Sequence, residues 1–435
     1  MQSTIEHIKS LDSIRLRTNL VFSHPECLQN FDIDLSKLPA VADLVVELIK
    51  RDYKSPAEIP PHSRWRHFEA SPVFNKTIDR IGDLIKSWKT AGIDHLEIVR
   101  RLLDLFVTSV LLDAGAGAKW KYTNSSGTYN RSEGLGIASL DLFLEGALSS
   151  SSNPFQCDSK GLENITVEKL SKVFQVSEEN PLVGLEGRCN LLQRLGSTLL
   201  NYPEFFSRDS VSRPGNLVDY LINHPTTKTV DGTHQVQIEC LWHVVVVGFS
   251  GVWPDTRTKL GDTSLGDVWH CKALEAVSKL PSKPLGQWPG SESLVTFHKL
   301  SQWLTYSLME PLLLANIKFI GVEKMTGLPE YRNGGLFVDM GVLTLKKSIL
   351  SSVPAGTIPK FQVWDDAIVE WRALTIPLLD KTAELVRQRL NMTAEQLPLA
   401  KVLEAGTWKA GREVAAKLRK DKGPPIEIIS DGTVF

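Results

Sequence analysis

Two carboxylates, a guanidinium and an amide lie in the sixteen residues LPEYRNGGLFVDMGVL, from Leu328 to Leu343. Glu330 and Arg332 come shortly before the pair Gly334-Gly335, which predicts either a close approach of the backbone to a ligand or a positive φ. Asp339 then lies in an apolar run, where a carboxylate needs a partner or a chemical role because an unpaired buried charge is costly. The stretch is therefore a candidate site. The alternative is that Glu330 and Arg332 pair with each other and cap a helix, because structural ion pairs resemble functional ones.

A second candidate stretch, residues 113–122, places small residues between a carboxylate and the pair Lys119-Trp120. Small residues allow the backbone to approach a ligand, and Trp120 would form a wall of the pocket. The sequence lacks both the spacing of a P-loop and a dinucleotide fingerprint after a strand. Arg188 follows a glycine at an expected helix start, where it can meet an anion or pair with Glu186.

Three further clusters of polar and aromatic residues interrupt apolar helices. One precedes an apolar helix, where polar groups either capture an anion or simply cap the helix. Another stands at a helix start, and the third has an acid and a base on either side of an aromatic ring. A shared pocket is the simplest explanation for clusters in so many places. The residues are Tyr129 and Arg131, His298 and Lys299, and Glu370, Trp371 and Arg372.

The elements that must position these residues are mainly helices. Apolar residues recur at helical intervals in several stretches. The alternation in THQVQIE and the valine run at residues 244–247 both favour a short strand or hairpin, but a buried helix fits them too. We therefore predict a mostly α, multi-helix fold with a small β element. The helical stretches are residues 3–21, 41–49, 78–88, 93–112, 135–148, 166–174, 297–314 and 369–390.

The length and the charge set broad limits. The 435 residues allow two domains or one large domain. We expect one large, mainly helical domain, with two lobes at residues 1–150 and 151–435 around a central pocket as an option. The 49 basic and 50 acidic side chains leave a formal charge of −1, which gives no general attraction to nucleic acid or to an anionic membrane.

The five cysteines are scattered, without a C-x-x-C pair or a nearby histidine at ligand spacing. This pattern argues against a structural zinc site and a disulfide framework, so we expect reduced thiols in a cytoplasmic protein. The amino terminus lacks the continuous apolar region of a secretory signal, and the most apolar window, residues 241–249, is too short to cross a bilayer. We predict no metal, no cofactor and no membrane role.

Six segments spread over nearly the whole chain resemble one family. Together they are similar to the uracil-catabolism protein 4 family, which is found in fungi and bacteria beside pyrimidine-degrading genes. The resemblance implies a role in uracil breakdown, where association with other enzymes of that pathway is an option. The segments are RSEGLGIAS, HKLSQWLTYSL, LPEYRNGGLFVDMGVL, EWRALTIPLLD, GTWKAGRE and PPIEIISDGTVF.

The order of elements is also similar to that of the queuosine salvage proteins, which are nucleotide N-ribosylhydrolases related to helix-hairpin-helix DNA glycosylases. Their D-Y-R-V-P-Q stretch corresponds to Glu330-Tyr331-Arg332 here, and the G-x-L that follows it corresponds to Gly341-Val342-Leu343. Their helix start Y-K-R-A-Q corresponds to Lys299 and Gln302, and their G-Y-W-S to Tyr129 and Ser132. The similarity implies a fold like that of the helix-hairpin-helix glycosylases.

The two resemblances together imply an N-ribosylhydrolase that cleaves ribosylurea 5-phosphate, a ring-opened uridine nucleotide, to urea and ribose 5-phosphate. Glu replaces Asp at position 330 and Asn333-Gly334-Gly335 replaces V-P-Q, which argues against queuosine itself as the substrate. Glu330 is the first candidate for the carboxylate that stabilises an oxocarbenium-like centre or activates water, followed by Asp339 and Asp113. The substrate phosphate needs fixed cations, for which the candidates are Lys299, Arg332 and Arg188. The predicted substrate-binding residues are Lys119, Trp120, Tyr129, Arg131, Arg188, His298, Lys299, Gln302, Arg332, Asn333, Glu370, Trp371 and Arg372.

Three other classes of protein compete with this hypothesis. A non-catalytic partner that scaffolds pyrimidine-catabolic enzymes would carry the polar clusters on separate surfaces, whereas an enzyme would bring Asp113, Lys299, Glu330 and Arg372 into one pocket. A phosphoribosyltransferase should show a strand that ends in paired acids, and residues 244–250 contain no acidic pair. A nucleic-acid glycosylase is disfavoured by the near-neutral charge and by the lack of a dense basic face.

Overall fold

The computed structural model describes residues 1–73, 76–117, 119–253, 257–351, 353–354 and 356–429. The chain forms two compact units. Unit 1 combines Met1–His62, Asp255–Gln302 and Glu323–Ser430, and unit 2 combines Ser63–Pro254 with Trp303–Val322. A single domain, with lobes at residues 1–150 and 151–435 as an option, stays a prediction.

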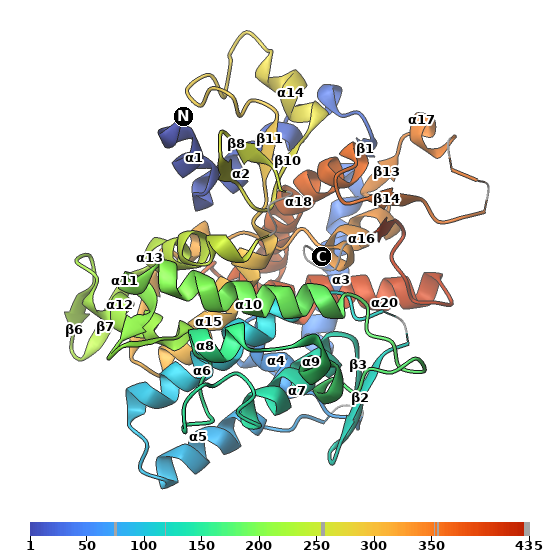
Figure 1. Cartoon of the computed structure of the whole chain (residues 1–435). Helices are drawn as coiled ribbons and strands as arrows, with labels where there is room; N and C mark the ends of the chain where they lie inside the picture. Colours follow the sequence, from blue (N-terminus) through green and yellow to red (C-terminus); the bar gives the residue numbers. More distant parts are fainter. Residues whose placement is uncertain (74–75, 118, 254–256, 352, 355, 430–435) are drawn as a thin grey trace. The chain divides into compact units, whose positions relative to one another are not determined.

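Unit 1 is mainly helical, and most of its elements are labelled in Figure 1. Its strands are short and pair as β1 with β13, β8 with β9, β10 with β11 and β14 with β15. The helices are α1 (Gln2–Ile8), α2 (Leu11–Phe22), α3 (Leu38–Asp52), α14 (Lys272–Ser278), α16 (Tyr331–Asp339), α17 (Lys347–Leu350), α18 (Asp366–Leu390), α19 (Leu399–Val402) and α20 (Trp408–Leu418). The strands are β1 (Phe31–Ile33), β8 (Lys259–Leu260), β9 (Thr263–Ser264), β10 (Val268–His270), β11 (Leu294–Thr296), β13 (Leu343–Leu345), β14 (Lys360–Gln362) and β15 (Glu427–Ile429).

Helix α18 organises unit 1, because it packs against α2, α3 and α16. Every residue from Ala367 to Leu379 is buried, so the charged residues Glu370 and Arg372 lie inside the core and need partners there. The helix ends at Asn391, which adopts a left-handed φ of 53°. Asparagine tolerates this conformation better than most residues do.

The pair Gly334-Gly335 lies inside α16, and the prediction of a positive φ at this pair is wrong. The positive φ of this region, 74°, occurs instead at Gly341, just after the helix. A Cβ atom on Gly334 would lie 2.9 Å from the indole of Trp371 in α18. Glycine therefore allows α16 to approach α18 closely, and the sequence pattern alone does not reveal this packing.

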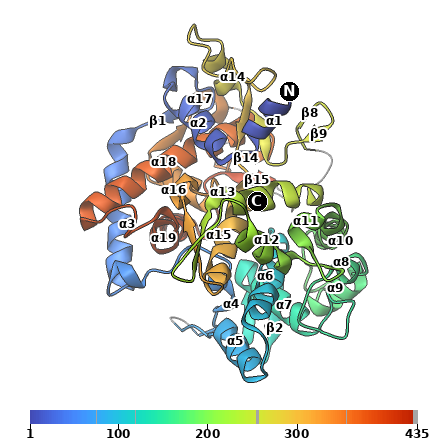
Figure 2. The ribbon, with the colours of Figure 1, turned by 90° about the vertical axis from the view of Figure 1, so that its left-hand side faces the viewer.

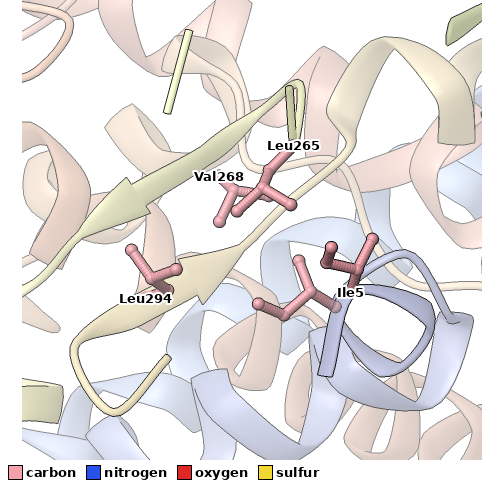
Figure 3. Packing of buried hydrophobic residues seen from close by; sticks show 5 residues of the cluster. Ile5, Leu265, Val268 and Leu294 are labelled. Atoms are coloured by element: carbon pink, nitrogen blue, oxygen red, sulfur yellow. The ribbon is translucent and has the colours of Figure 1, made fainter. Parts of the chain in front are cut away.

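A small cluster of aliphatic residues joins the amino terminus to the strands β10 and β11. Figure 3 shows Ile5 of α1, Val268 of β10 and Leu294 of β11 pointing toward one another, with Leu265 beside them. Each of these side chains is at most 6% exposed. The cluster thus fixes the segment that precedes the start of α15, which is Lys299–Leu313.

Unit 2 is also mainly helical. Its helix α6 packs against α5 and α7, which lie near it in Figure 2. The helices are α4 (Trp65–Phe68), α5 (Arg80–Thr90), α6 (His95–Leu111), α7 (Arg131–Leu144), α8 (Ser159–Glu163), α9 (Val167–Val173), α10 (Leu185–Asn201), α11 (Pro203–Phe206), α12 (Leu217–Asn223) and α13 (Ile238–His243). The strands are β2 (Lys121–Asn124), β3 (Gly127–Asn130), β4 (Ser207–Arg208), β5 (Val211–Ser212), β6 (Lys228–Val230), β7 (Thr233–Gln237) and β12 (Ile317–Ile320).

Helix α6 is the core helix of unit 2. Asp94 caps it by accepting bonds from the backbone N–H groups of Leu96 and Glu97. Every residue from Ile98 to Leu111 is buried, as expected of a helix that is surrounded by other elements. The long apolar pattern at residues 93–112 therefore gave the correct element.

The mostly α prediction is confirmed, and so is the small β element. The alternating stretch forms strand β7, which pairs antiparallel with β6 and parallel with β12. Residues 244–247 are helical, in a π-helical turn that continues α13. The run has no alternation that would separate a strand from a buried helix, which is why the sequence left both open.

Candidate functional site

Glu330 is held by the helix that it begins. It is the N-cap of α16, and its carboxylate accepts the backbone N–H groups of Asn333 at 2.6 Å and Arg332 at 2.8 Å. The capping part of the alternative interpretation is therefore confirmed. The guanidinium of Arg332 donates to the carbonyl of Lys422 at 3.0 Å and lies 5.0 Å from the ring of Tyr331. Each carboxylate oxygen of Glu330 is fixed by one backbone bond and keeps further accepting capacity.

The environment of Glu330 raises the pKa of its carboxyl group. Burial is the largest cause, and it acts against the two backbone bonds and the positive charges of Lys299 and Arg332, which lower the pKa. A carboxyl group with a raised pKa beside cations is suited to acid–base work or to the stabilisation of a developing positive charge. This combination makes Glu330 the strongest catalytic candidate in unit 1.

Asp267 is a site residue that the sequence analysis missed. Its two carboxylate oxygens accept both terminal nitrogens of Arg372, each at 2.8 Å, and the backbone N–H of Lys299 at 2.9 Å. Burial opposes its ionisation, but Arg372 and these hydrogen bonds lower its pKa overall. Arg372 also donates through Nε to the carbonyl of Pro329, next to Glu330. The Asp267–Arg372 pair therefore ties α18, the start of α15 and the residue before Glu330 together.

The side-chain amides of Gln302 and Asn333 hold the buried segment in front of Glu330. The Oε1 atom of Gln302 accepts the backbone N–H of Thr326 at 3.3 Å. The Nδ2 group of Asn333 donates to the carbonyl of Leu328 at 3.0 Å. Both amides were predicted to bind substrate, and both are buried in unit 1.

Seven residues thus form one connected group, which we call the Glu330 cluster. The sequence predicted all of them except Asp267. A carboxylate between a glycine and the apolar pair Val268-Trp269 was the available signal, but its partner lies 105 residues away in the sequence. The members are Asp267, Lys299, Gln302, Glu330, Arg332, Asn333 and Arg372.

Four other predicted residues of unit 1 have structural partners. Asp339 forms a bidentate ion pair with Arg419 at 2.7 and 2.5 Å. The carboxylate of Glu370 accepts three consecutive backbone N–H groups, those of residues 29 to 31. His298 binds the carbonyl of Ile8 at 2.9 Å, and Trp371 donates to the carbonyl of Gly334 at 3.1 Å. The substrate-contacting roles of these four residues stay predictions.

Asp113 and Arg188 belong to unit 2. Asp113 forms an ion pair at 2.8 Å with Arg64, whose guanidinium is fully buried. The guanidinium of Arg188 donates to the carbonyls of Leu112 at 2.9 Å and Ala114 at 2.8 Å. Arg188 therefore holds the turn after α6, and convergence of Asp113 with the Glu330 cluster stays a prediction.

The aromatic candidates of unit 2 are buried and bonded. Trp120 donates to the carbonyl of Phe174 at 2.9 Å, and the hydroxyl of Tyr129 accepts Arg80 at 2.7 Å. Lys119 is exposed. Arg131 is also exposed and begins α7 with a positive φ of 52°. Their part in substrate binding stays a prediction.

Unit 1 has a surface depression that contains none of the predicted site residues. It lies at the carboxyl-terminal end of α18. Its first residue, Glu384, is about 18 Å further along this helix than Arg372, at about 1.5 Å per residue. The depression therefore lies well away from the Glu330 cluster. Its lining residues are Glu384, Arg387, Gln388, Asn391, Met392 and Thr393.

The described residues also bear on two other kinds of site. They contain no group of three or more His, Cys, Asp or Glu side chains placed to hold a metal ion. Within the same part of the chain, no helix combines the length and the apolar character needed to cross a bilayer.

Fold and site together define a mostly α-helical protein with a partly buried Glu–Lys–Arg cluster at a helix start. The chain belongs to the family described as "Protein of unknown function (DUF1688)", which matches residues 7–435. It is similar to "Uracil catabolism protein 4" of Lachancea kluyveri, with 44% identity over 100% of both chains. It is also similar to "Protein urg3" of Schizosaccharomyces pombe, with 42% identity over 99% of both chains.

Proposed function

We propose that this chain acts in uracil catabolism as an N-ribosylhydrolase. Its substrate is ribosylurea 5-phosphate, and its products are urea and ribose 5-phosphate. The name of the relative from Lachancea kluyveri supports the pathway. The observation that carries the chemistry is the half-buried carboxyl group of Glu330, which two backbone N–H groups orient beside Lys299 and Arg332. We place the reaction in the cytoplasm.

The reaction replaces one bond to the anomeric carbon by another. The C1′–N bond breaks, and its electron pair leaves with the urea nitrogen. The oxygen of a water molecule bonds to C1′, and Glu330 takes up one proton of this water and passes it to the departing nitrogen. The carboxylate also stabilises the positive charge that develops at the anomeric carbon. Atoms and charge balance without a cofactor.

The cations of the cluster suit the phosphate of the substrate. Lys299 and Arg332 lie close enough to Glu330 for their charges to lower its pKa. Arg372 is already neutralised by Asp267, so it serves to position the segment before Glu330. We therefore assign the phosphate contact to Lys299 and Arg332, because cationic side chains bind phosphate through strong charge-assisted hydrogen bonds.

The test is an assay of urea release by the purified protein. The substrates are ribosylurea 5-phosphate and unphosphorylated ribosylurea. Each is assayed with the wild-type protein and with the Glu330→Gln variant. We expect urea from the phosphorylated compound, and a loss of about a hundredfold or more in the variant, which keeps the shape of the side chain but removes the base.

Glu323→Gln is the matched control, because Glu323 is an exposed glutamate of unit 1 outside the cluster. It should leave the rate unchanged. A well-folded wild type that releases urea from neither compound would contradict the hydrolase proposal. That outcome would favour the alternative, a non-catalytic partner of pyrimidine-catabolic enzymes.

A further inference from the structure

Two fully buried amides in the Glu330 cluster each have one unused hydrogen-bonding atom. Gln302 and Asn333 are both 0% exposed. Among the described residues, the Nε2 group of Gln302 and the Oδ1 atom of Asn333 have no hydrogen-bond partner. Buried polar atoms without partners are rare and costly, so each calls for a specific explanation.

The backbone partners determine which of the unused atoms is a hydrogen-bond donor and which is an acceptor. Thr326 offers an N–H to Gln302, which must therefore turn its carbonyl oxygen toward Thr326 and leave its NH₂ group unused. Leu328 offers a carbonyl to Asn333, which must turn its NH₂ group toward Leu328 and leave its oxygen unused. One amide thus presents a donor and the other an acceptor.

The two amides bind the same short stretch of chain. Thr326 and Leu328 are two residues apart, so their Cα atoms are at most about 7 Å apart. Both precede Glu330 by at most four residues. A ligand that reaches the carboxylate of Glu330 and also satisfies both amides must carry an acceptor and a donor close together.

We propose that Gln302 and Asn333 recognise the ureido group of the substrate. The NH₂ group of Gln302 donates to the ureido carbonyl, and the Oδ1 atom of Asn333 accepts one of its N–H groups. This inference rests on the proposed function and adds the residues that determine the leaving group.

The arrangement also assists bond cleavage. When the C1′–N bond breaks, its electron pair moves to the nitrogen and delocalises onto the ureido oxygen. A hydrogen bond from Gln302 to this oxygen becomes stronger as the charge grows, so it stabilises the transition state more than the ground state. Gln302 is thus a specificity-determining residue that contacts the leaving group.

Gln302→Glu is the variant that separates recognition from folding. A glutamate still offers an oxygen to the N–H of Thr326, but it replaces the unused donor by a second oxygen. Gln396→Glu is the matched control, because Gln396 also accepts a backbone N–H through Oε1, at 2.9 Å, and is exposed. Circular dichroism and the unfolding midpoint verify that each variant is folded.

The assay compares two leaving groups on the same sugar phosphate. We expect Gln302→Glu to lower kcat/KM for ribosylurea 5-phosphate by about ten- to a hundredfold, the usual effect of one unpaired buried polar contact. For 4-nitrophenyl riboside 5-phosphate, whose leaving group has no ureido pattern, the change should stay within about threefold. An equal loss with both substrates, or no loss with either, would overturn the ureido assignment and leave the hydrolase proposal standing.

Calorimetry of ribosylurea 5-phosphate binding separates the two proposals. Suppose that wild type binds the compound without releasing urea, and that Gln302→Glu weakens this binding at least tenfold. This outcome would support ureido recognition and refute the hydrolase. If wild type neither binds nor cleaves the compound, both proposals fall.

Discussion

Several opposing influences act on the single carboxyl group of Glu330. Burial raises its pKa, whereas two backbone N–H groups and the charges of Lys299 and Arg332 lower it. The net rise means that Glu330 takes up a proton at higher pH than an exposed glutamate does. A carboxylate can act as a base only while it is ionised. The proposed hydrolysis should therefore fall as the pH drops through this raised pKa.

Replacing Lys299 tests this balance. Lys299→Met removes a charge that favours the ionised form of Glu330, so the pKa of Glu330 should rise further. The acid limb of the kcat/KM profile should therefore move to higher pH. Lys50→Met, at an exposed position of unit 1, is the control and should leave the profile in place. A profile that moves to lower pH would contradict this view of Glu330.

Glu370 tests whether a buried carboxylate serves the fold or the ligand. Besides the N–H groups of residues 29 to 31, it accepts the side-chain amide of Asn30 at 3.2 Å. Glu370→Gln replaces one acceptor oxygen by a donor and should lower the free energy of unfolding by about 2 to 3 kcal/mol. Glu275→Gln, on the exposed side of α14, should change it by less than about 0.5 kcal/mol. Denaturant titration measures both.

If Glu370→Gln keeps its stability and instead raises KM, Glu370 contacts the substrate. That result would restore the role predicted from the sequence.

At the scale of elements, the approach of α16 to α18 depends on a missing side chain. Gly334→Ala would place a Cβ atom 2.9 Å from the indole of Trp371 and 3.0 Å from the hydroxyl of Thr375. We expect a loss of roughly 1 to 3 kcal/mol of stability, because the helices must separate. Gly187→Ala, in an open position of α10, should instead gain about 0.5 to 1 kcal/mol through helix propensity. Equal unfolding midpoints for the two variants would refute this packing argument.

The helices could be predicted from the sequence because their signal is local. Apolar periodicity located α3, α6 and α18 from a window of about fifteen residues. The function of Gly334 could not be predicted in this way, because the atoms that need its space belong to Trp371, on another helix. The type of element formed by residues 244–247 could not be predicted for a different reason: four consecutive valines show no apolar periodicity.

At the scale of the whole molecule, the sequence revealed individual site residues better than their partners. Glu330 and Asn333 stand out because they are polar among apolar neighbours. The partner of Arg372 could not be found, since Asp267 is 105 residues away and only the fold brings the two together. The family resemblance was predictable because its motifs are long, and it is confirmed.

The net charge of −1 also makes a prediction for the whole molecule. With so little net charge, the protein should attract a phosphorylated substrate only at short range. We expect kcat/KM for ribosylurea 5-phosphate to change by less than about threefold between low and physiological salt. A steep decline with salt would indicate long-range attraction that the composition does not provide.

The division of unit 1 among three stretches of chain has a consequence for its synthesis. Helices α2 and α3 leave the ribosome early, but their packing partner α18 begins at Asp366, more than three hundred residues later. The main part of unit 2, which includes α6 and the helices around it, is complete long before that point. We therefore expect α6 to become protected from proteases first in nascent chains. The amino-terminal helices α2 and α3 should become protected only near the end of translation.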